Sequence, residues 1–569
     1  MFIDFEGIDG SGKTTLSNLL AARLKRLGYR VTHAREGGEL QSPIARRIRE
    51  LTRDARLLEM GARTEFFLNL ARDAQQLEEV IAPALTRGDV CITDRYLYSQ
   101  LALSGGGRGL PQAELQPSCE LASQGLWPDL VILVDVDPDL ARLRKRLGKL
   151  KERREKDSDS RKGLVGAGLS VRVREQFREL ARQEPSRWLV IENNEQPLWV
   201  LEQRIVDAVV ARLEGREPTI QRIAAPPAAP APFSPEPAAI EQRFYDVLDG
   251  LETREPALGV FLLGGMPGTA AHKRRLAAAE RFPELTARSL TGLFDEAAWD
   301  LRELLAPRAP AEVAQSLVYD ASARADALRT RLFPLAPRDV LQSLKRVDTE
   351  VAWALREHGL HAGQLADVLC GLAGVDTAAA WVMRERGVAA GLYADVARSL
   401  QGVAGERADA LRERLLPNDR LAVLRSVTGL DSPFASALRA SLEQHALKLV
   451  MRSLTGLTTD EAFALRERGA ARSKEAIDSL DGLDHPRAWA LREAYAARWP
   501  ATVLSSMRGL PLGERTRALL ARVLEASPSR LPLLRNACAV VTSAPAPQAP
   551  SSIRIAEVAP ERSALLAPT

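Results

Sequence analysis

A glycine-rich loop near the start of the chain has the residue types and spacing of a phosphate-binding site. Residues 7–14 read GIDGSGKT, which matches the pattern G-x4-G-K-[ST]. Glycines let successive backbone N–H groups converge on a phosphate, and the N-terminus of a following helix adds partial positive charge. Lys13 can place a point charge on the β- and γ-phosphates of a nucleotide, and the Thr14 hydroxyl is suited to Mg²⁺. The alternative, a plain glycine turn, is disfavoured because a strand pattern precedes the loop and a helix pattern follows it.

The loop therefore predicts a site for ATP with Mg²⁺. The residues expected at this site are Gly7, Asp9, Gly10, Ser11, Gly12, Lys13, Thr14 and Thr15. Phosphoryl transfer needs positioning and the cancellation of negative charge, and little covalent chemistry from the protein. Further cations are therefore expected close to the loop.

Charged residues stand at the ends of two other apolar runs. Arg35 follows the run that starts at Val31, and Asp94 and Arg95 end the run that starts at Val90. An arginine in such a place can bind a phosphate with two parallel hydrogen bonds. Asp94 adds a carboxylate suited to the Mg²⁺ shell, although an Asp-Arg pair can also be a purely structural ion pair.

The elements that must position these residues alternate in type over residues 1–215. Short apolar or β-branched runs start at Phe2, Val31, Val90, Leu130 and Trp188, with helical stretches between them. This alternation predicts βαβ units, and hence a five-stranded parallel sheet that is buried on both faces. Ligands of such α/β sheets bind beyond the carboxyl ends of the strands, which is where most of the charged residues stand.

Over about the first 210 residues the chain resembles the thymidylate kinase family. The stretches that carry the resemblance are FEGIDGSGKTT, REGG in place of the family's REPGG, DRY with the later SGGGRGL, and the helical FFLNLARDAQQ. The resemblance implies a P-loop nucleoside-monophosphate-kinase fold. It also implies transfer of the γ-phosphate of ATP to dTMP with Mg²⁺, and a homodimer formed through this domain.

The resemblance assigns the acceptor nucleotide to residues of the loop and beyond it. Asp9 would hold the 3′-OH of the deoxyribose, and Arg35 and Arg95 would bind the acceptor phosphate. Arg72 would bind thymine O4, and Leu68 replaces an aromatic residue that stacks on the base. The full set assigned to this nucleotide is Asp9, Arg35, Leu68, Arg72, Arg95, Ser99, Gly105 and Arg108.

The resemblance also assigns residues to the transfer step. The residues expected to act in catalysis are Lys13, Asp94, Arg95 and Arg161. Mg²⁺ would be held by Thr14 and Asp94. Arg161 lies near the end of the strongly basic stretch 140–163, where the family has its lid, and Ser11 stands at a loop position where some members carry an arginine. The catalytic cation is therefore expected from Arg161, although a basic run without this context would be a solvated helix face.

Departures from the family pattern cluster at the base pocket. They are Leu68, Leu103, Ser104 and the missing proline. Phosphoryl transfer is therefore better supported than the choice of thymine. Two alternatives stay open, namely a kinase for another nucleoside monophosphate, and a regulatory NTPase or scaffold that acts through the rest of the chain.

The chain beyond residue 215 has a different composition. Residues 216–240 are rich in Pro and Ala and predict a semi-rigid linker, and the Pro-rich residues 536–569 predict a disordered tail. Residues 241–535 repeat the pattern S-L-x-G-L-x4-A-x2-L-R with a period of about 27 residues. Its first apolar position recurs at Leu263, Leu290, Leu317, Leu344, Leu372, Leu400, Val427, Leu454, Leu480 and Met507. Each copy has room for two short helices, so the copies must stack into an all-α solenoid, with the last as a cap and a concave surface suited to a protein partner.

From the copy at Leu290 onward, an arginine stands twelve residues after that apolar position in eight successive copies. These arginines are Arg302, Arg329, Arg356, Arg384, Arg412, Arg439, Arg466 and Arg492. They could bond carbonyls or carboxylates of the next repeat, or form an electropositive strip for an acidic partner. Because the copies keep arginine rather than lysine, the forked geometry of the guanidinium favours the structural explanation.

Composition makes several classes of protein unexpected. The net charge is +4, which is small for 569 residues, so no bulk binding of nucleic acid is expected. The four cysteines lie far apart, which argues against a zinc site or a disulfide framework. No apolar run approaches the roughly 18–20 residues of a membrane span, and no signal-peptide pattern precedes the first strand. We therefore expect a cytoplasmic protein.

Overall fold

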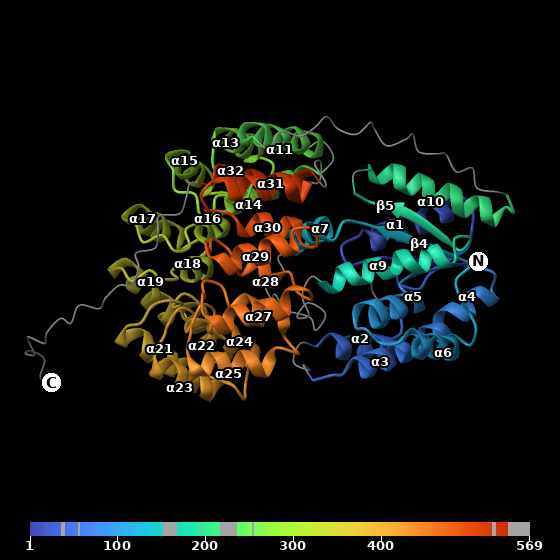
Figure 1. Cartoon of the computed structure of the whole chain (residues 1–569), viewed down its shortest axis with the longest axis horizontal. Helices are drawn as coiled ribbons and strands as arrows, with labels where there is room; N and C mark the ends of the chain where they lie inside the picture. The colour runs from blue at the N-terminus through green and yellow to red at the C-terminus, as the bar shows by residue number, and fades with distance from the viewer. Residues whose placement is uncertain are drawn as a thin grey trace, which may run out of the picture.

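The chain is described from a computed structural model, and it has two parts (Figure 1). An α/β domain comes first and an all-helical part follows it. The described residues are 1–35, 40–54, 57, 59–151, 168–194, 196–216, 236–252, 255–525 and 531–543.

The N-terminal domain is built on one parallel sheet of five strands in the order β2-β3-β1-β4-β5. The strands are β1 (Phe2–Glu6), β2 (Val31–His33), β3 (Val90–Asp94), β4 (Leu130–Asp135) and β5 (Trp188–Glu192). The central strand β1 pairs with β3 and with β4, so that Phe5 lies opposite both Asp94 and Ile132. The sheet predicted from the sequence is confirmed, with all five strands in place.

Helices cover both faces of this sheet. They are α1 (Lys13–Arg26), α2 (Pro43–Arg53), α3 (Ala62–Gln76), α4 (Ala82–Thr86), α5 (Leu97–Gln100), α6 (Gln112–Ser123), α7 (Pro138–Lys151), α9 (Gly168–Gln183) and α10 (Leu198–Leu213), with the π-helical segments η2 (Leu77–Ile81) and η3 (Leu101–Gly107). Successive side chains of a strand point to opposite faces. Ile3 therefore joins a core with Leu16 of α1 and Ile205 of α10, whereas Phe2 joins a core with Phe177 of α9.

The all-helical part alternates short inner helices with longer outer helices. The inner helices are α12 (Pro256–Leu262), α14 (Pro283–Ser289), α16 (Pro310–Ser316), α18 (Pro337–Ser343), α20 (Leu365–Cys370), α22 (Tyr393–Ser399), α24 (Arg420–Ser426), α26 (Leu447–Ser453), α28 (Glu475–Asp478), α30 (Pro500–Ser506) and α32 (Leu531–Thr542), preceded by α11 (Pro237–Glu252). The outer helices are α13 (Thr269–Ala278), α15 (Glu296–Leu305), α17 (Ala323–Leu332), α19 (Glu350–His361), α21 (Ala378–Ala389), α23 (Glu406–Leu415), α25 (Pro433–Leu442), α27 (Asp460–Ala470), α29 (Pro486–Tyr495) and α31 (Glu514–Glu525). The predicted pair of helices in each repeat is confirmed. None of the described helices is long and apolar enough to span a membrane.

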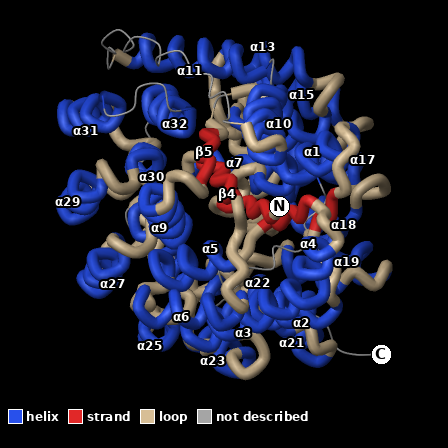
Figure 2. Tube along the Cα trace, turned by 90° about the vertical axis from the view of Figure 1, so that its right-hand side faces the viewer, coloured by secondary structure: helices blue, strands red, loops and turns tan. Residues whose placement is uncertain are grey.

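The first and last helices of the stacked repeats pack against each other, which closes the stack into a ring. Each inner helix packs against the next, and α32 packs against α11, which in turn packs against α12. Arg535 of α32 donates hydrogen bonds to the carbonyl oxygens of Leu262 and Gly264, at 3.3 and 2.9 Å. Figure 2 shows the outer helices following one another around a circle. Residues 237–543, called the repeat ring below, form the expected stack of helical repeats, and α31 and α32 close this stack into a ring where a terminal cap was expected.

Buried arginines join each repeat to the next through hydrogen bonds. Arg302 donates from Nε to Oγ of Ser316 in the following repeat at 2.9 Å, and from Nη2 to the carbonyl oxygen of Leu290 in its own repeat at 2.8 Å. The arginines buried in this way are Arg275, Arg302, Arg329, Arg356, Arg384, Arg412, Arg439, Arg466 and Arg492. The structural explanation is confirmed, and an exposed electropositive strip is excluded for these residues. Arg275 joins the set although the sequence around it departs from the repeat pattern.

Two expected domain boundaries fall inside helices. α11 begins at Pro237, within the predicted linker, because Ile240 is fully buried in the repeat ring. α32 runs to Thr542, within the predicted tail, because Cys538 is fully buried. The remainder of the linker and of the tail lies outside the described residues.

The N-terminal domain lies against one face of the repeat ring (Figures 1 and 2). α7 contacts both α12 and α32, and Arg420 of α24 lies 3.5 Å from Glu59 of the N-terminal domain. α7 follows the carboxyl end of β4. The edge of the sheet at which α/β proteins bind ligands therefore faces the ring.

Candidate active site

The loop between β1 and α1 has the geometry of a phosphate cradle. Gly10 and Gly12 have φ angles of 88° and 96°, in the left-handed region that favours glycine. A Cβ atom on Gly10 would lie 2.3 Å from the carbonyl oxygen of Ala141 in α7, so only glycine fits between the loop and that helix. Because α1 begins at Lys13, its unpaired N–H groups face the loop.

The Lys13 ammonium is held inside this loop. Its Nζ donates a hydrogen bond to the carbonyl oxygen of Ile8 at 2.9 Å, and the side chain is buried. Burial lowers the pKa of Lys13 to about 8, and the nearby charge of Arg95 acts in the same direction. A bound triphosphate would reverse this effect, because it places negative charge beside the ammonium.

Thr14 and Asp94 form a pair that fits Mg²⁺. Thr14 Oγ1 donates a hydrogen bond to Asp94 Oδ2 at 2.5 Å, which joins α1 to the end of β3. Burial raises the pKa of Asp94, but Lys13 and Arg35 outweigh burial and the pKa is lowered, so the carboxylate is charged at neutral pH. Asp94 Oδ1 is buried and has no hydrogen-bond partner among the described residues. Mg²⁺ takes few protein oxygens and completes its shell with phosphate and water, so these two side chains fit it.

Arg95 reaches back across the loop from a strained backbone. Its φ of 81° is uncommon for a residue other than glycine. Nη2 donates a hydrogen bond to Asp9 Oδ1 at 2.5 Å, and Nη1 donates to Ser99 Oγ at 3.0 Å. Burial lowers the pKa of Arg95, but the carboxylates of Asp9 and Glu6 outweigh burial and the pKa is raised. The backbone conformation thus places the guanidinium between two carboxylates beside the loop.

Glu6, at the end of β1, is a site residue that the sequence motifs do not single out. Ser99 Oγ donates a hydrogen bond to Glu6 Oε2 at 2.7 Å, and Arg95 Nη1 lies 3.8 Å from the same oxygen. Burial raises the pKa of Glu6, and Arg95 opposes this shift. Ser99, predicted at the acceptor nucleotide, therefore links Glu6 to Arg95 in the structure. The signal for Glu6 is its place directly before the first glycine of the loop.

The guanidinium groups of Arg35, Arg49 and Arg72 lie close to one another near the end of β3. Arg35 Nη1 donates a hydrogen bond to the main-chain oxygen of Asp94 at 2.8 Å, so the ends of β2 and β3 meet. Burial lowers the pKa of Arg49 in α2 to about 9, and the charges of Arg35 and Arg72 act in the same direction. Like charges held together favour an anionic ligand. Arg49 was not predicted, because in the sequence it is one of several arginines on an amphipathic helix.

Arg72 and Leu68 share one face of α3, four residues apart. Arg72 donates hydrogen bonds from Nε to Asp73 Oδ1 at 2.8 Å and from Nη1 to Asn69 Oδ1 at 3.2 Å. Gln100 Nε2 donates to the other oxygen of Asp73 at 2.7 Å. The neighbouring side chains thus fix Arg72 close to Arg35, and its contact with a base stays a prediction.

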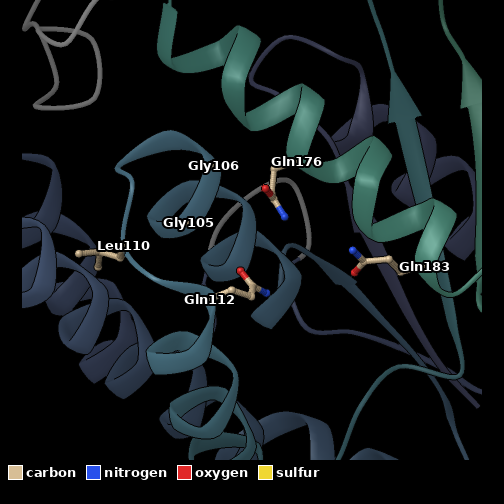
Figure 3. Close-up of a pocket in the computed structure, with 6 residues that line it drawn as sticks. All are labelled: Gly105, Gly106, Leu110, Gln112, Gln176 and Gln183. Carbon is tan, nitrogen blue, oxygen red and sulfur yellow. The ribbon is translucent and has the colours of Figure 1, made fainter.

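Gly105 and Arg108 are surrounded by residues other than those of the phosphate cradle. Gly105 of η3 lines a surface pocket of about 350 Å³ (Figure 3). The other residues that line this pocket are Gly106, Leu110, Gln112, Gln176 and Gln183, and none belongs to the loop. Arg108 Nη2 forms an ion pair with Glu65 Oε2 of α3 at 2.7 Å. The geometry gives these two residues packing and ion-pair roles, and their contact with an acceptor nucleotide stays a prediction.

Asn193, after β5, is a second site residue that the motifs do not single out. Its Nδ2 donates a hydrogen bond to the carbonyl oxygen of Ser11 in the loop at 2.7 Å. Its own carbonyl oxygen accepts a hydrogen bond from Arg144 Nη1 of α7 at 2.8 Å. Two adjacent asparagines at a strand end are the sequence signal. Arg161 lies outside the described residues, so its catalytic role also stays a prediction.

Anion-binding groups thus stand on both sides of the Thr14–Asp94 pair. The glycine loop and Lys13 lie on one side, and Arg35 and Arg95 lie on the other. Such a site suits the transfer of a phosphoryl group between two molecules that both carry phosphate. The fold and the site therefore define a P-loop kinase that acts on a phosphorylated acceptor.

Comparisons with known proteins identify the family. The family model described as thymidylate kinase matches residues 5–205. A thymidylate kinase of Trichlorobacter lovleyi is 38% identical over 215 residues, which are 37% of this chain and 98% of that protein. A thymidylate kinase of Deinococcus radiodurans is 38% identical over 192 residues, which are 34% of this chain and 88% of that protein. The chain belongs to the thymidylate kinase family through its N-terminal domain.

A solved structure of the thymidylate kinase of Ehrlichia chaffeensis matches 37% of this chain and 98% of its own chain. The identity is 24% and the TM-score is 0.28, so this likeness adds nothing to the fold given by the sheet order. The repeat ring lies beyond the residues that the family model matches.

Proposed function

We propose that the N-terminal domain transfers the γ-phosphate of ATP to dTMP, which gives ADP and dTDP. The observation that carries this proposal is the convergence at the end of β3. Asp94 accepts a hydrogen bond from Thr14 of the phosphate cradle on its side chain, and from Arg35 on its main-chain oxygen. The two halves of a two-phosphate site therefore meet at one residue, and the named relatives support dTMP as the acceptor.

Different residues of the site stabilise the charges of the donor and acceptor phosphates during the transfer. Lys13 and the loop N–H groups hold the β- and γ-phosphates of ATP. Arg35 and Arg95 hold the acceptor phosphate with one of its oxygens in line with the γ-phosphorus. The new P–O bond forms as the bond to ADP breaks, and no base is required because the attacking oxygen is already anionic. Mg²⁺, held by Thr14 and Asp94, would supply further neutralisation of phosphate charge.

Three other residues complete the proposed site. Asp9, held by Arg95, binds the 3′-OH of the acceptor, and Arg72 binds O4 of the thymine base. Arg161 supplies the cation that neutralises the γ-phosphoryl group during transfer. This assignment rests on the basic stretch 140–163, which contains Arg161, and on the neutral side chain of Ser11 in the loop.

Replacing Lys13 tests the proposal directly. In the full-length chain, Lys13→Ala should lower the turnover of dTMP with MgATP by about two to three orders of magnitude, because a transition-state charge contact is lost. Formation of dTDP is followed by chromatography. Lys25→Ala, at an exposed lysine of the same helix, is the matched control and should leave turnover unchanged. Activity of Lys13→Ala at the control level would reject the assignment of the loop.

We further propose that the protein is a homodimer through this domain and works in the cytoplasm. The packed helices α2 and α3 expose Ile44 and Phe67, which are 53% and 59% exposed, and such apolar surface supports pairing with a second copy. All four cysteines are free, which supports a reducing compartment. Light scattering of the full chain should give twice the mass of one chain, and the mass of a single chain would reject the dimer.

A further inference from the structure

Among the described residues, three ion pairs are seen between α7 of the kinase domain and the repeat ring. They are Asp139–Lys474 at 3.7 Å, Arg142–Glu475 at 3.8 Å and Arg144–Glu255 at 2.9 Å. The ring partners come from the region of α28 and from the residue before α12, which are far apart in the sequence. The ring thus contacts α7 through two separate segments, and Figure 1 shows α7 lying beside the ring.

Glu475 of the ring places a buried charge in the contact with α7. Its side chain is 1% exposed. Burial raises the pKa of this carboxyl, but Arg142 and Lys474 outweigh burial and the pKa is lowered, so it is buried as a carboxylate. A buried charge is costly without a partner. At the same register four earlier repeats also carry an acidic residue, namely Glu312, Asp339, Asp367 and Asp395, and each of these is only partly buried. The burial of the charge therefore sets apart the repeat that meets α7.

The opposite side of α7 forms the back wall of the phosphate cradle. The carbonyl oxygen of Ala141 lies where a Cβ atom on Gly10 would be only 2.3 Å away. One turn further along α7, Arg144 Nη1 donates a hydrogen bond to the carbonyl oxygen of Asn193 at 2.8 Å. Asn193 Nδ2 in turn donates to the carbonyl oxygen of Ser11 at 2.7 Å. A continuous chain of hydrogen bonds therefore runs from α7 to the loop.

The last of these bonds fixes a phosphate-binding group. The carbonyl of Ser11 and the N–H of Gly12 belong to one planar trans peptide, in which they point in opposite directions. When Asn193 holds the carbonyl, the N–H is turned the other way, toward the space enclosed by the loop. The orientation of this donor therefore depends on where Asn193 stands, and Asn193 is held by Arg144.

Glu255 of the ring sets the position of Arg144. Its Oε1 accepts a hydrogen bond from Nη2 of Arg144 at 2.9 Å, while Nη1 of the same guanidinium bonds Asn193. The planar fork of arginine lets one side chain hold both partners at once. With Glu255 in place, the long side chain has little freedom to leave Asn193, since it is anchored at both ends of the fork.

We propose that Glu255 is a positioning residue for ATP, acting through Arg144 and Asn193 on the phosphate loop. The repeat ring is on this view a part of the nucleotide site, although it touches no phosphate. This inference rests on the proposed ATP-dependent function of the N-terminal domain. It predicts that the ring affects the binding of ATP and does not affect the binding of dTMP.

The test uses full-length Glu255→Gln, which keeps the size of the side chain and removes its charge. The pair is partly exposed, so the expected effect is about a two- to five-fold rise in the KM for ATP and in the Kd for MgADP. The KM for dTMP, the kcat and the melting temperature should not change. The matched control is Glu296→Gln, which removes the same charge from a Glu–Arg pair on the outer side of the ring, with Arg324 at 3.0 Å. Glu296→Gln should leave all five quantities unchanged.

A double variant separates the proposed route from a general effect of charge. If Glu255 acts through Arg144, then Glu255→Gln should add nothing to the Kd for MgADP in an Arg144→Ala background. Full additivity, an unchanged Kd in the single variant, or an equal change in Glu296→Gln would each overturn the inference. Calorimetry with MgADP needs no turnover. A wild-type chain that binds MgADP but does not phosphorylate dTMP would therefore refute the proposed function while the positioning role is still decided by the Kd values.

Discussion

Lys13 combines a required positive charge with a buried position. Its pKa of about 8 lies below the usual 10.5 of lysine, so in the free protein the ammonium loses its proton as the pH rises through 8. The phosphates of MgADP favour the charged form. Binding above pH 8 should therefore take up close to one proton, and uptake should be small at pH 7 to 7.5, where Lys13 is already protonated.

Calorimetry of MgADP binding in buffers of different ionisation enthalpy measures this uptake. Lys13→Met is the control, because it keeps the length of the side chain but cannot take up a proton. Equal proton uptake by the two proteins at pH 9 would show that another group titrates.

Arg72 is the residue on which the choice of base depends in this account. Arg72→Ala should raise the KM for dTMP by about ten- to a hundred-fold, because a thymine carbonyl loses its partner at a cost of about 1–3 kcal/mol. The KM for ATP should change little. Arg72 also bonds the buried Asp73, so the melting temperature is measured in parallel. If the variant lost activity equally with all nucleoside monophosphates, Arg72 would be structural.

Residues that belong to a recognisable motif were predictable, whereas single residues outside any motif that the sheet brings to the loop were not. The loop from Gly7 to Thr14 is a contiguous pattern whose chemistry depends on local backbone geometry. Glu6 and Asn193 act only because parallel pairing places the ends of β1 and β5 beside the loop and Arg95. A single carboxylate or amide at a strand end carries no such signal by itself.

At the scale of elements, the repeat depends on a forked side chain that serves two repeats. Arg384 donates from Nε to Ser399 Oγ of the next repeat at 3.1 Å, and from Nη2 to the carbonyl oxygen of Val375 in its own repeat at 2.7 Å. Burial lowers the pKa of Arg384 to about 10, so it remains charged at neutral pH. The bonds to both repeats offset the cost of burying this charge.

Arg384→Lys should therefore lower the melting temperature of the full chain by several degrees. A lysine ammonium is a single point and cannot span both repeats, which leaves a buried acceptor unpaired at a cost of about 1–3 kcal/mol. Arg386→Lys, at an exposed arginine of the same helix, is the control and should melt like the wild type. Equal melting of all three proteins would contradict the fastening role.

The strands and the helical repeats were predictable from the sequence, but closure of the ring was not. Short apolar runs between helical stretches indicate buried parallel strands, and a period of about 27 residues indicates stacked repeats. Closure depends on a small rotation between neighbouring repeats that accumulates around the ring. Arg535, which joins α32 to α12, lies outside the repeat pattern, so nothing in its local sequence marks it as the closing residue.

For the whole molecule, the kinase domain and the ring meet where nucleotides are proposed to bind. α7 lies between the phosphate loop and the ring, and both of its sides are in contact. The ring therefore has a direct physical route to the ATP half of the site. The acceptor half, built from β2, β3 and α3, contains the residues on which the choice of substrate is proposed to depend.

The central claim is that dTMP is the phosphate acceptor, and one competition experiment tests this claim most directly. The full-length chain is given MgATP and an equimolar mixture of dTMP, dUMP, dCMP, dAMP and dGMP, and the diphosphates are resolved by chromatography as they form. The account predicts that dTDP is the main product, with kcat/KM for dTMP at least about fivefold above that for dCMP and dAMP, which lack the O4 carbonyl of thymine, since one base contact is worth about 1–3 kcal/mol. Preferential formation of another diphosphate, or ATP hydrolysis without any diphosphate product, would contradict it.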